Sequence, residues 1–325
     1  MELICPAGTP AALRAAVDAG ADAVYCGFRD ETNARNFPGL NFSRAEMAEG
    51  IAYAHARGAK VLVAINTFPR AGQLGLWHGA VDDAVAAGAD ALILADAGLI
   101  AYAAERHPAQ RLHVSVQAAA ANPDAIAFYV EAFGVKRVVL PRVLSVPEIA
   151  AITRATACET EVFVFGGLCV MAEGRCSLSS HATGQSPNMH GVCSPASHVS
   201  YRDDGNTLVS RLGDFTINKF ANREPAAYPT LCKGRFRTGI GAGYIFEEPV
   251  SLDAAEMLPG LKKAGVTALK IEGRQRGRAY IASVVASFRA ALSALEAGRP
   301  ITGAGLTAMT EGQTTTVGAY RKTWR

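Results

Sequence analysis

One local pattern repeats along most of the chain: a short apolar run is followed by an alanine-rich amphipathic stretch that ends near a glycine. The apolar runs are nearly continuous and do not alternate with polar residues, which is typical of parallel strands covered on both faces. Eight runs fit this description: Glu2–Cys5, Ala23–Phe28, Lys60–Asn66, Ala91–Asp96, Leu112–Gln117, Arg137–Leu140, Glu161–Phe165 and Ala268–Glu272. The pattern predicts an α/β fold, a (β/α)8 TIM-like barrel.

The stretches between these runs have helical spacing, and a terminal glycine suits the left-handed cap of a helix. They include Thr9–Gly20, Ser43–Gly58, Leu76–Gly88 and Pro123–Gly134, and Ala279–Gly298 follows the eighth run. We therefore expect each predicted strand to be followed by a helix that packs on the outside of the barrel.

The repeat is interrupted once, between Gly166 and about Asp253, where glycine, serine, proline and four cysteines replace it. We expect residues 1–300 to form a single barrel domain with an insertion, residues 167–252, after the seventh strand. Loops that follow barrel strands build the functional face, so the insertion belongs at the barrel mouth. The C-terminal tail, residues 301–325, is rich in Thr and Gly and fits a hairpin, a partner contact or a loose end equally well.

Composition narrows the class of protein. Half of the residues are hydrophobic and 19% are charged, as in a globular protein with a sizeable core. The net charge is only +3 and no run of five basic residues occurs, so no nucleic-acid partner is expected. No leader and no run of about 18 apolar residues is visible, which predicts a cytoplasmic protein without a transmembrane segment.

Seven cysteines, an odd number, argue against a disulfide framework in a reducing compartment. Four of them fall in the insertion: Cys169, Cys176, Cys193 and Cys232. Thiolates are soft ligands that suit iron-sulfur clusters or zinc. The spacing contains neither a C-x2-C pair nor the bacterial ferredoxin run, so by itself it fits a cluster and zinc equally well and also allows no metal.

The other candidate ligands are weaker. Cys5 and Cys26 lie within predicted strands and Cys158 lies just before the seventh, where a cysteine is most often a small buried residue. Three histidines of the insertion could replace a thiolate, but four cysteines already complete a set. These histidines are His181, His190 and His198.

Two segments of the insertion carry a family resemblance. Glu161–Cys169 (EVFVFGGLC) and Gly174–Ser179 (GRCSLS) resemble the signature of peptidase family U32, the collagenase-like peptidases. Further matching segments extend over nearly the whole chain: Ala21–Tyr25, Asn33–Asn36, Asn41–Ser43, Ile65–Asn66, His113–Gln117 and Leu269–Arg274. A second set is similar to the branch of the family that works in ubiquinone biosynthesis: Cys5–Gly8, Pro141–Leu144, Cys193–Ala196 and Leu231–Arg235.

The resemblance implies a 4Fe-4S cluster on the four cysteines of the insertion. It also implies a paralogous partner, UbiV, in a heterodimer that hydroxylates a prenylated phenol precursor of ubiquinone without O2, with prephenate as the oxygen donor. Two residues depart from the wider family: Ser197 stands where many members have cysteine, and Val143 where many have glutamate. Both departures fit the ubiquinone branch and weaken a transfer of RNA-modifying activity.

Polar residues at the predicted strand ends are the candidate catalytic groups, because a carboxylate substrate needs cations and hydrogen-bond donors there. They are Arg35, Asn66, Gln117, Arg142, Lys270, Glu272 and Arg274. Asn66 and Gln117 fit a structural role as well as a functional one. The three charged residues of the eighth strand share one face and would be costly to bury unpaired, so they should pair or face a ligand.

Three other functions stay open at this point. RNA base hydroxylation would be favoured by an appended RNA-binding domain, which is not evident in this sequence. A non-catalytic iron-sulfur scaffold or electron-transfer partner would need the cluster but no substrate pocket. Peptidase activity is disfavoured, because neither an H-E-x-x-H zinc motif nor a G-x-S-x-G nucleophile motif is present.

Overall fold

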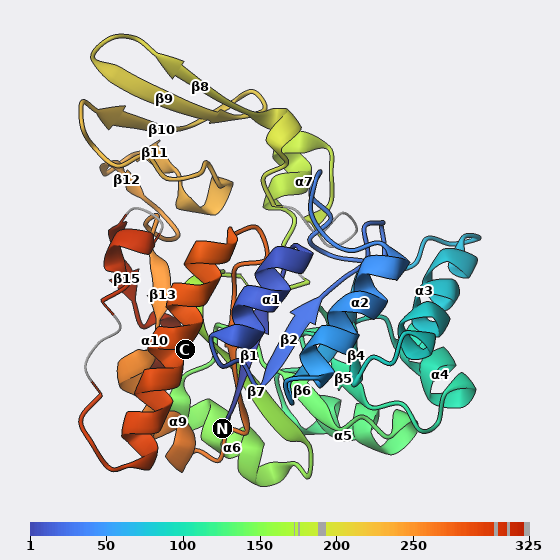
Figure 1. Cartoon of the computed structure of the whole chain (residues 1–325). Coiled ribbons are helices and arrows are strands. Elements are labelled where there is room, and N and C mark those ends of the chain that lie inside the picture. The colour runs from blue at the N-terminus through green and yellow to red at the C-terminus, as the bar shows by residue number, and fades with distance from the viewer. Residues whose placement is uncertain (172, 175, 188–192, 302–304, 311–312, 322–325) are drawn as a thin grey trace.

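A closed barrel of eight parallel strands forms the centre of the computed structural model, as the repeat predicts (Figure 1). The structure describes residues 1–171, 173–174, 176–187, 193–301, 305–310 and 313–321. The barrel strands are β1 (Glu2–Pro6), β2 (Ala23–Cys26), β3 (Lys60–Ile65), β4 (Ala91–Leu94), β5 (Leu112–Val114), β6 (Arg137–Val139), β7 (Glu159–Gly167) and β14 (Ala268–Ile271). The barrel closes where β14 pairs with both β1 and β7, through Leu3 opposite Leu269 and Leu269 opposite Val162.

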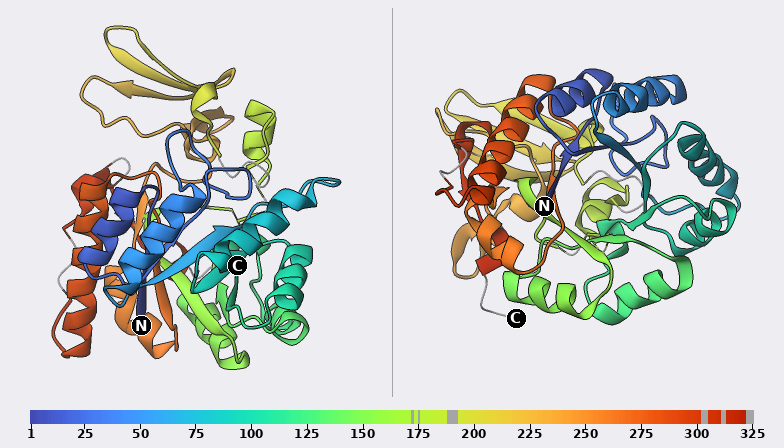
Figure 2. Two further views of the ribbon diagram at one scale, coloured as in Figure 1. Left: turned by 45° about the vertical axis from the view of Figure 1, so that its right-hand side comes forward. Right: turned by 60° about the horizontal axis from the view of Figure 1, so that its bottom comes forward.

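A helix lies outside the barrel after each of the first six strands, and two more flank β14 (Figure 2). They are α1 (Pro10–Asp18), α2 (Arg44–His55), α3 (Leu74–Ala86), α4 (Ala97–Arg106), α5 (Pro123–Phe133), α6 (Val146–Ala155), α9 (Leu258–Lys263) and α10 (Arg278–Glu296). Local sequence fixes several ends. Ser43 and Glu46 form a reciprocal capping box at α2, and Gly134 ends α5 in the left-handed conformation that its sequence position predicts.

Alternate strand residues build two layers. Leu3, Cys5 and Cys26 face the helices and are fully buried there, as expected of small packed residues. The intervening residues face the barrel axis and form a second cluster, most of whose members are small or aliphatic: Ile4, Ala23, Tyr25, Leu62, Ala64, Ala91, Ile93 and Ala268. The four alanines leave room on the axis for larger side chains from other strands.

The insertion leaves the barrel at the carboxyl end of β7 and stands over that end of the barrel (Figure 1). It contains the short helix α7 (Leu178–Thr183), an antiparallel sheet of β8 (Val199–Asp203), β9 (Thr207–Leu212) and β10 (Phe215–Ala221), and a hairpin of β11 (Arg235–Thr238) and β12 (Gly241–Tyr244). Strand β13 (Ser251–Asp253) then returns antiparallel to β7. The insertion is thus a β-rich unit placed beside the functional face.

The described part of the tail packs against the barrel. Strand β15 (Thr315–Thr316) pairs in parallel with β13, so this segment is not a hairpin. Tyr320 is buried, and its hydroxyl donates a hydrogen bond to the carbonyl of Phe163 in β7. The tail therefore covers the β7 side of the barrel.

Among the described helices, α10 alone is long and apolar enough to cross a membrane by length and composition. Its apolar residues are instead buried against the barrel, among them Ile281, Val284 and Phe288. The same composition is expected of a core helix in a globular protein.

Candidate functional site

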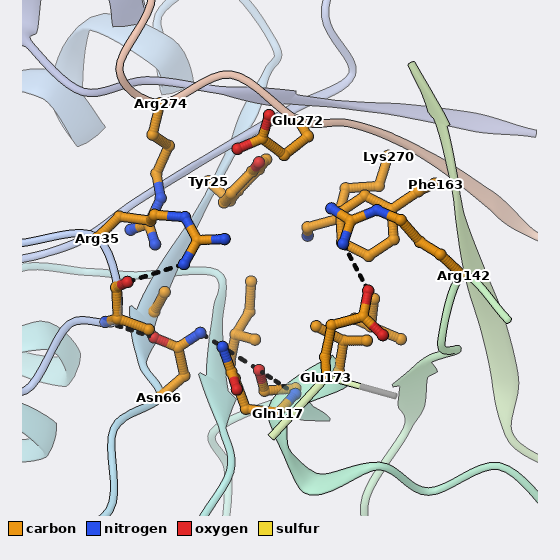
Figure 3. A pocket seen from close by; sticks show the side chains of 16 residues that line it. Tyr25, Arg35, Asn66, Gln117, Arg142, Phe163, Glu173, Lys270, Glu272 and Arg274 are labelled. Carbon is orange, nitrogen blue, oxygen red and sulfur yellow. Dashed lines mark hydrogen bonds and ion pairs between the residues drawn. The ribbon is translucent and has the colours of Figure 1, made fainter. Parts of the chain in front are cut away.

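A polar pocket lies on the barrel axis at the carboxyl ends of the strands (Figure 3). It encloses about 60 Å³. All seven residues that the sequence analysis proposed as catalytic line it: Arg35, Asn66, Gln117, Arg142, Lys270, Glu272 and Arg274. Six of the barrel strands end one to three residues earlier than predicted, whereas β1 and β7 end one and two residues later; of these seven residues only Lys270 lies within a strand. The others lie in the loops that follow the strands, where side chains can reach the axis.

Lys270 is held at the bottom of the pocket by Glu161 of the neighbouring strand β7. Lys270 Nζ lies 2.5 Å from Glu161 Oε1 and 3.9 Å from the centre of the Tyr25 ring. Burial lowers the pKa of Lys270, although the Glu161 carboxylate acts in the opposite direction. The predicted alternative of pairing thus holds for Lys270, which also remains in the pocket wall.

Arg274 and Arg35 supply positive charge on the opposite side. Arg274 Nη1 donates to Asn33 Oδ1 at 2.6 Å, and Arg35 Nη1 donates to the carbonyl of Ala34 at 3.0 Å. Burial lowers the pKa of Arg274 to about 10, with the nearby Arg35 acting in the same direction. Arg274 is therefore still a cation at neutral pH. The printed acceptor of Arg274, the amide oxygen of Asn33, is uncharged and so does not neutralise the guanidinium charge of Arg274.

Asn66 and Gln117 differ in what they offer a ligand. Asn66 Oδ1 accepts from Ala34 N at 3.0 Å and its Nδ2 donates to Ser115 Oγ at 3.3 Å, so the side chain ties two loops together. Gln117 Oε1, by contrast, is buried and has no hydrogen-bond partner among the residues that the structure describes. Gln117 fits a binding role better, and Asn66 a structural one.

Nine of the described residues that line the pocket are outside the predicted set, and three of them carry an aromatic ring or a charge. Tyr25 lies in the apolar strand β2, and its hydroxyl donates a hydrogen bond to the carbonyl of Ile271 at 2.9 Å. Burial raises the pKa of the Tyr25 hydroxyl. Phe163 lies under Arg142, whose guanidinium carbon is 3.6 Å from the ring centre. Glu173 belongs to the insertion and pairs with Arg142, with Nη1 and Oε1 2.5 Å apart. Burial raises the pKa of Glu173, although Arg142 acts in the opposite direction.

The four cysteines of the insertion lie in one neighbourhood. The pKa of Cys232 is raised to about 12, first by burial and then by the charges of Cys193, Cys169 and Cys176. The pKa of Cys169 is raised to about 11 by burial, with Glu173 and Cys193 acting in the same direction. Electrostatic influence of this kind requires short distances. Among the described residues, no three His, Cys, Asp or Glu side chains converge on the position of a single metal ion.

The donor set fits an iron-sulfur cluster. The thiols of Cys169 and Cys232, whose pKa values are raised, stay protonated unless a metal centre compensates the thiolates. A 4Fe-4S cluster needs no convergence on one point, because each of its four thiolates binds a different iron atom. Lys233 lies close by: it lowers the pKa of Cys232 and donates from Nζ to the carbonyl of Val250 at 3.2 Å.

The three histidines of the insertion show no such grouping where they are described. His181 lies against the ring of Phe215, with centroids 5.5 Å apart, and His198 Nδ1 lies 3.0 Å from Ser197 Oγ. His190 is outside the described residues.

Comparisons with known proteins place these features in a family. The model of peptidase family U32 matches residues 8–320. The tRNA hydroxylation protein P of Escherichia coli is 34% identical over 324 residues, which cover 92% of this chain and 69% of that protein. The 23S rRNA 5-hydroxycytidine synthase of the same organism is 31% identical over 91% of this chain but only 40% of its own length.

Among solved structures, one described as the U32 peptidase Mk0906 is 19% identical to this chain. It aligns with a TM-score of 0.41, over 50% of this chain and 68% of that one.

Proposed function

The chain belongs to peptidase family U32, and on that premise we propose that it is the 4Fe-4S subunit of an oxygen-independent hydroxylase. Specifically, we propose a UbiU-type chain of ubiquinone biosynthesis, acting in the cytoplasm as a heterodimer with a UbiV-like paralogue. Its substrate would be a prenylated phenol, and prephenate would be the oxygen donor.

The observation that carries this proposal is the position of the cysteine neighbourhood beside the pocket. The loop that joins Cys169 to Cys176 also supplies Glu173, which reaches into the pocket and pairs with Arg142. The proposed cluster ligands and the pocket thus share one stretch of chain, which supports a common role for them. A bound iron-sulfur cluster would supply the electron-transfer chemistry that the protein side chains cannot.

The charges of the pocket support an anionic oxygen donor. Glu161 and Glu173 offset Lys270 and Arg142, and Glu272 is the one further carboxylate among the described residues that line the pocket beside the two cations Arg35 and Arg274. A dicarboxylate would add its charge where the surplus of cations lies, and planar guanidinium groups bind carboxylates well. Gln117 could orient such a ligand through its amide.

The aromatic residues suit a ring-containing ligand. Tyr25 and Phe163 both line the pocket and hold cations against their faces. Their rings form apolar walls that exclude water beside the charged groups, which strengthens each electrostatic contact. These side chains bind and orient; we assign none of them a proton transfer.

RNA base hydroxylation is the second candidate, because the two relatives named above are hydroxylation proteins of tRNA and of 23S rRNA. What favours ubiquinone is the resemblance of four segments to that branch, with Ser197 and Val143 at the two departing positions. A non-catalytic cluster scaffold for a partner is the third candidate.

Anaerobic complementation separates the three. The chain and a UbiV-like paralogue are expressed without O2 in cells that lack both proteins, and quinone extracts and RNA nucleosides are analysed by mass spectrometry. We expect hydroxylated quinone products with the wild type and none with Cys176→Ala. Recovery of hydroxylated nucleosides alone would establish the RNA function. An Arg274→Gln chain with full quinone production would favour a scaffold role, because a scaffold needs no pocket.

A further inference from the structure

The contact between Glu173 and Arg142 is buried but incomplete. The two side chains are 7% and 5% exposed, and a single side-chain hydrogen bond, from Nη1 to Oε1, joins them, while the backbone N–H groups of Arg142 and Glu173 also interact with the Glu173 carboxylate. Arg142 Nε and Glu173 Oε2 are both buried without a hydrogen-bond partner among the residues described. An arginine and a carboxylate satisfy each other best through two parallel hydrogen bonds. This pair therefore leaves one donor and one acceptor unused, at a cost that a better-placed carboxylate would remove.

Arg142 is held in place independently of Glu173. Its guanidinium stacks on the ring of Phe163 at 3.6 Å, and it lies on the loop after β6. The Nε–H of Arg142, which has no partner among the described residues, can therefore donate to a ligand anion that replaces Glu173, without a large movement of the arginine. The partner that would have to leave is Glu173, which belongs to the segment between Cys169 and Cys176.

The small volume of the pocket also supports displacement of Glu173 by a ligand. The cavity encloses about 60 Å³, whereas small-molecule sites usually offer about 300 Å³ or more. Glu173 is part of the wall, so its departure would enlarge the cavity on the side of the cysteines. The loop is otherwise closely seated, since a Cβ on Gly174 would lie 2.0 Å from the carbonyl oxygen of Gln117.

We propose that Glu173 is a resident carboxylate that occupies the Arg142 subsite of the pocket, and that a carboxylate of the ligand displaces it. Displacement of Glu173 moves the Cys169–Cys176 segment. Ligand binding in the pocket therefore changes the positions of these two cysteines. The inference rests on the proposed function in one respect, namely that the ligand is a small dicarboxylate. It adds a specificity-determining role for Glu173, which sets the ligand affinity by competing for Arg142.

Calorimetric titration with succinate tests the competition on the full chain purified without O2. Glu173→Gln keeps the size of the side chain but removes the competing charge, and we expect it to bind succinate about tenfold more tightly than the wild type. Glu248→Gln, a matched change at an exposed glutamate of the insertion, should leave the affinity unchanged. Arg142→Gln should bind succinate at least tenfold more weakly.

Two results would overturn the proposal. Equal or weaker binding by Glu173→Gln would mean that Glu173 does not compete but supports Arg142, and absence of binding to any chain would remove the anion subsite altogether. Hydrogen–deuterium exchange gives an independent readout: succinate should change exchange in residues 169–176 of the wild type, and unchanged exchange despite binding would overturn the coupling. Neither measurement depends on iron or on hydroxylation, so failure here is distinct from failure of the proposed function.

Discussion

Lys270 Nζ lies 2.5 Å from Glu161 Oε1 in the interior of the barrel, and Glu161 is completely buried. The second oxygen of Glu161 lies 3.4 Å from Arg137 Nη1. The other terminal nitrogen of Arg137, Nη2, forms ion pairs with Glu159 Oε2 at 2.6 Å and with Glu2 Oε2 at 2.5 Å. A chain of alternating charges thus runs along the barrel axis from its amino-terminal end to the pocket. Each buried charge is compensated by the next, which allows Lys270 to form the pocket floor.

Glu161→Gln should destabilise the barrel strongly, because it leaves Lys270 buried without its counter-ion. Removal of one partner from a buried pair typically costs about 3–5 kcal/mol. Urea unfolding of the variant measures this loss. Glu256→Gln removes the exposed ion pair with Arg321 and should cost less than about 1 kcal/mol. Equal stability of the two variants would contradict the described chain of charges.

Gly174→Ala should lose most of its iron while the barrel stays folded. Gly174 has φ +77°, and a Cβ there would lie 2.0 Å from the backbone carbonyl oxygen of Gln117, which cannot easily move. The segment between Cys169 and Cys176 would have to move away from the Gln117 carbonyl, which would displace the proposed cluster ligands. Gly184→Ala is the control: its φ is +69° and a Cβ meets nothing within 4 Å. Iron content equal to wild type in Gly174→Ala would show that the loop is not seated there.

His113 should make the barrel sensitive to acid. Burial lowers its pKa well below the ordinary value near 6.5, with Arg137 and Arg111 acting in the same direction. Below about pH 6.5 His113 takes up a proton in the unfolded chain but stays neutral in the folded chain. The free energy of unfolding is therefore highest above pH 6.5 and decreases as the pH falls below it. The expected slope approaches about 1.4 kcal/mol per pH unit.

Urea midpoints measured from pH 7 to pH 5 test this dependence. His113→Gln cannot take up the proton and should show a flatter decline than the wild type. His181→Gln, at an exposed position of the insertion, should decline as the wild type does. A decline in His113→Gln as steep as in the wild type would exclude His113 as the cause.

The barrel could be predicted from the sequence because parallel strands and their covering helices leave a regular hydrophobic pattern. All eight predicted strands and the predicted helices are present; six of the strands end before the predicted residue, whereas β1 and β7 extend beyond it. The polar residue after a strand, such as Asn66, belongs to the loop, since side chains at the barrel mouth need backbone that has left the sheet.

The position of the insertion could be predicted from the sequence, but its secondary structure could not. Strands β8, β11 and β12 are largely exposed, and β9 and β10 mix buried and exposed positions without strict alternation, so the break was visible while the sheets were not. Glu173 and Tyr25 were missed for opposite reasons. Glu173 sits in a loop without periodicity, and Tyr25 reads as one more apolar residue of a strand.

Iron and acid-labile sulfide in the anaerobically purified chain are the most direct test of the central claim, that Cys169, Cys176, Cys193 and Cys232 hold a 4Fe-4S cluster. We predict about four irons and four sulfides per chain. Both should be lost in Cys176→Ala and kept in Cys26→Ala, because Cys26 is packed between barrel and helices. Stoichiometric zinc without sulfide would contradict the cluster and, with it, the proposed hydroxylase.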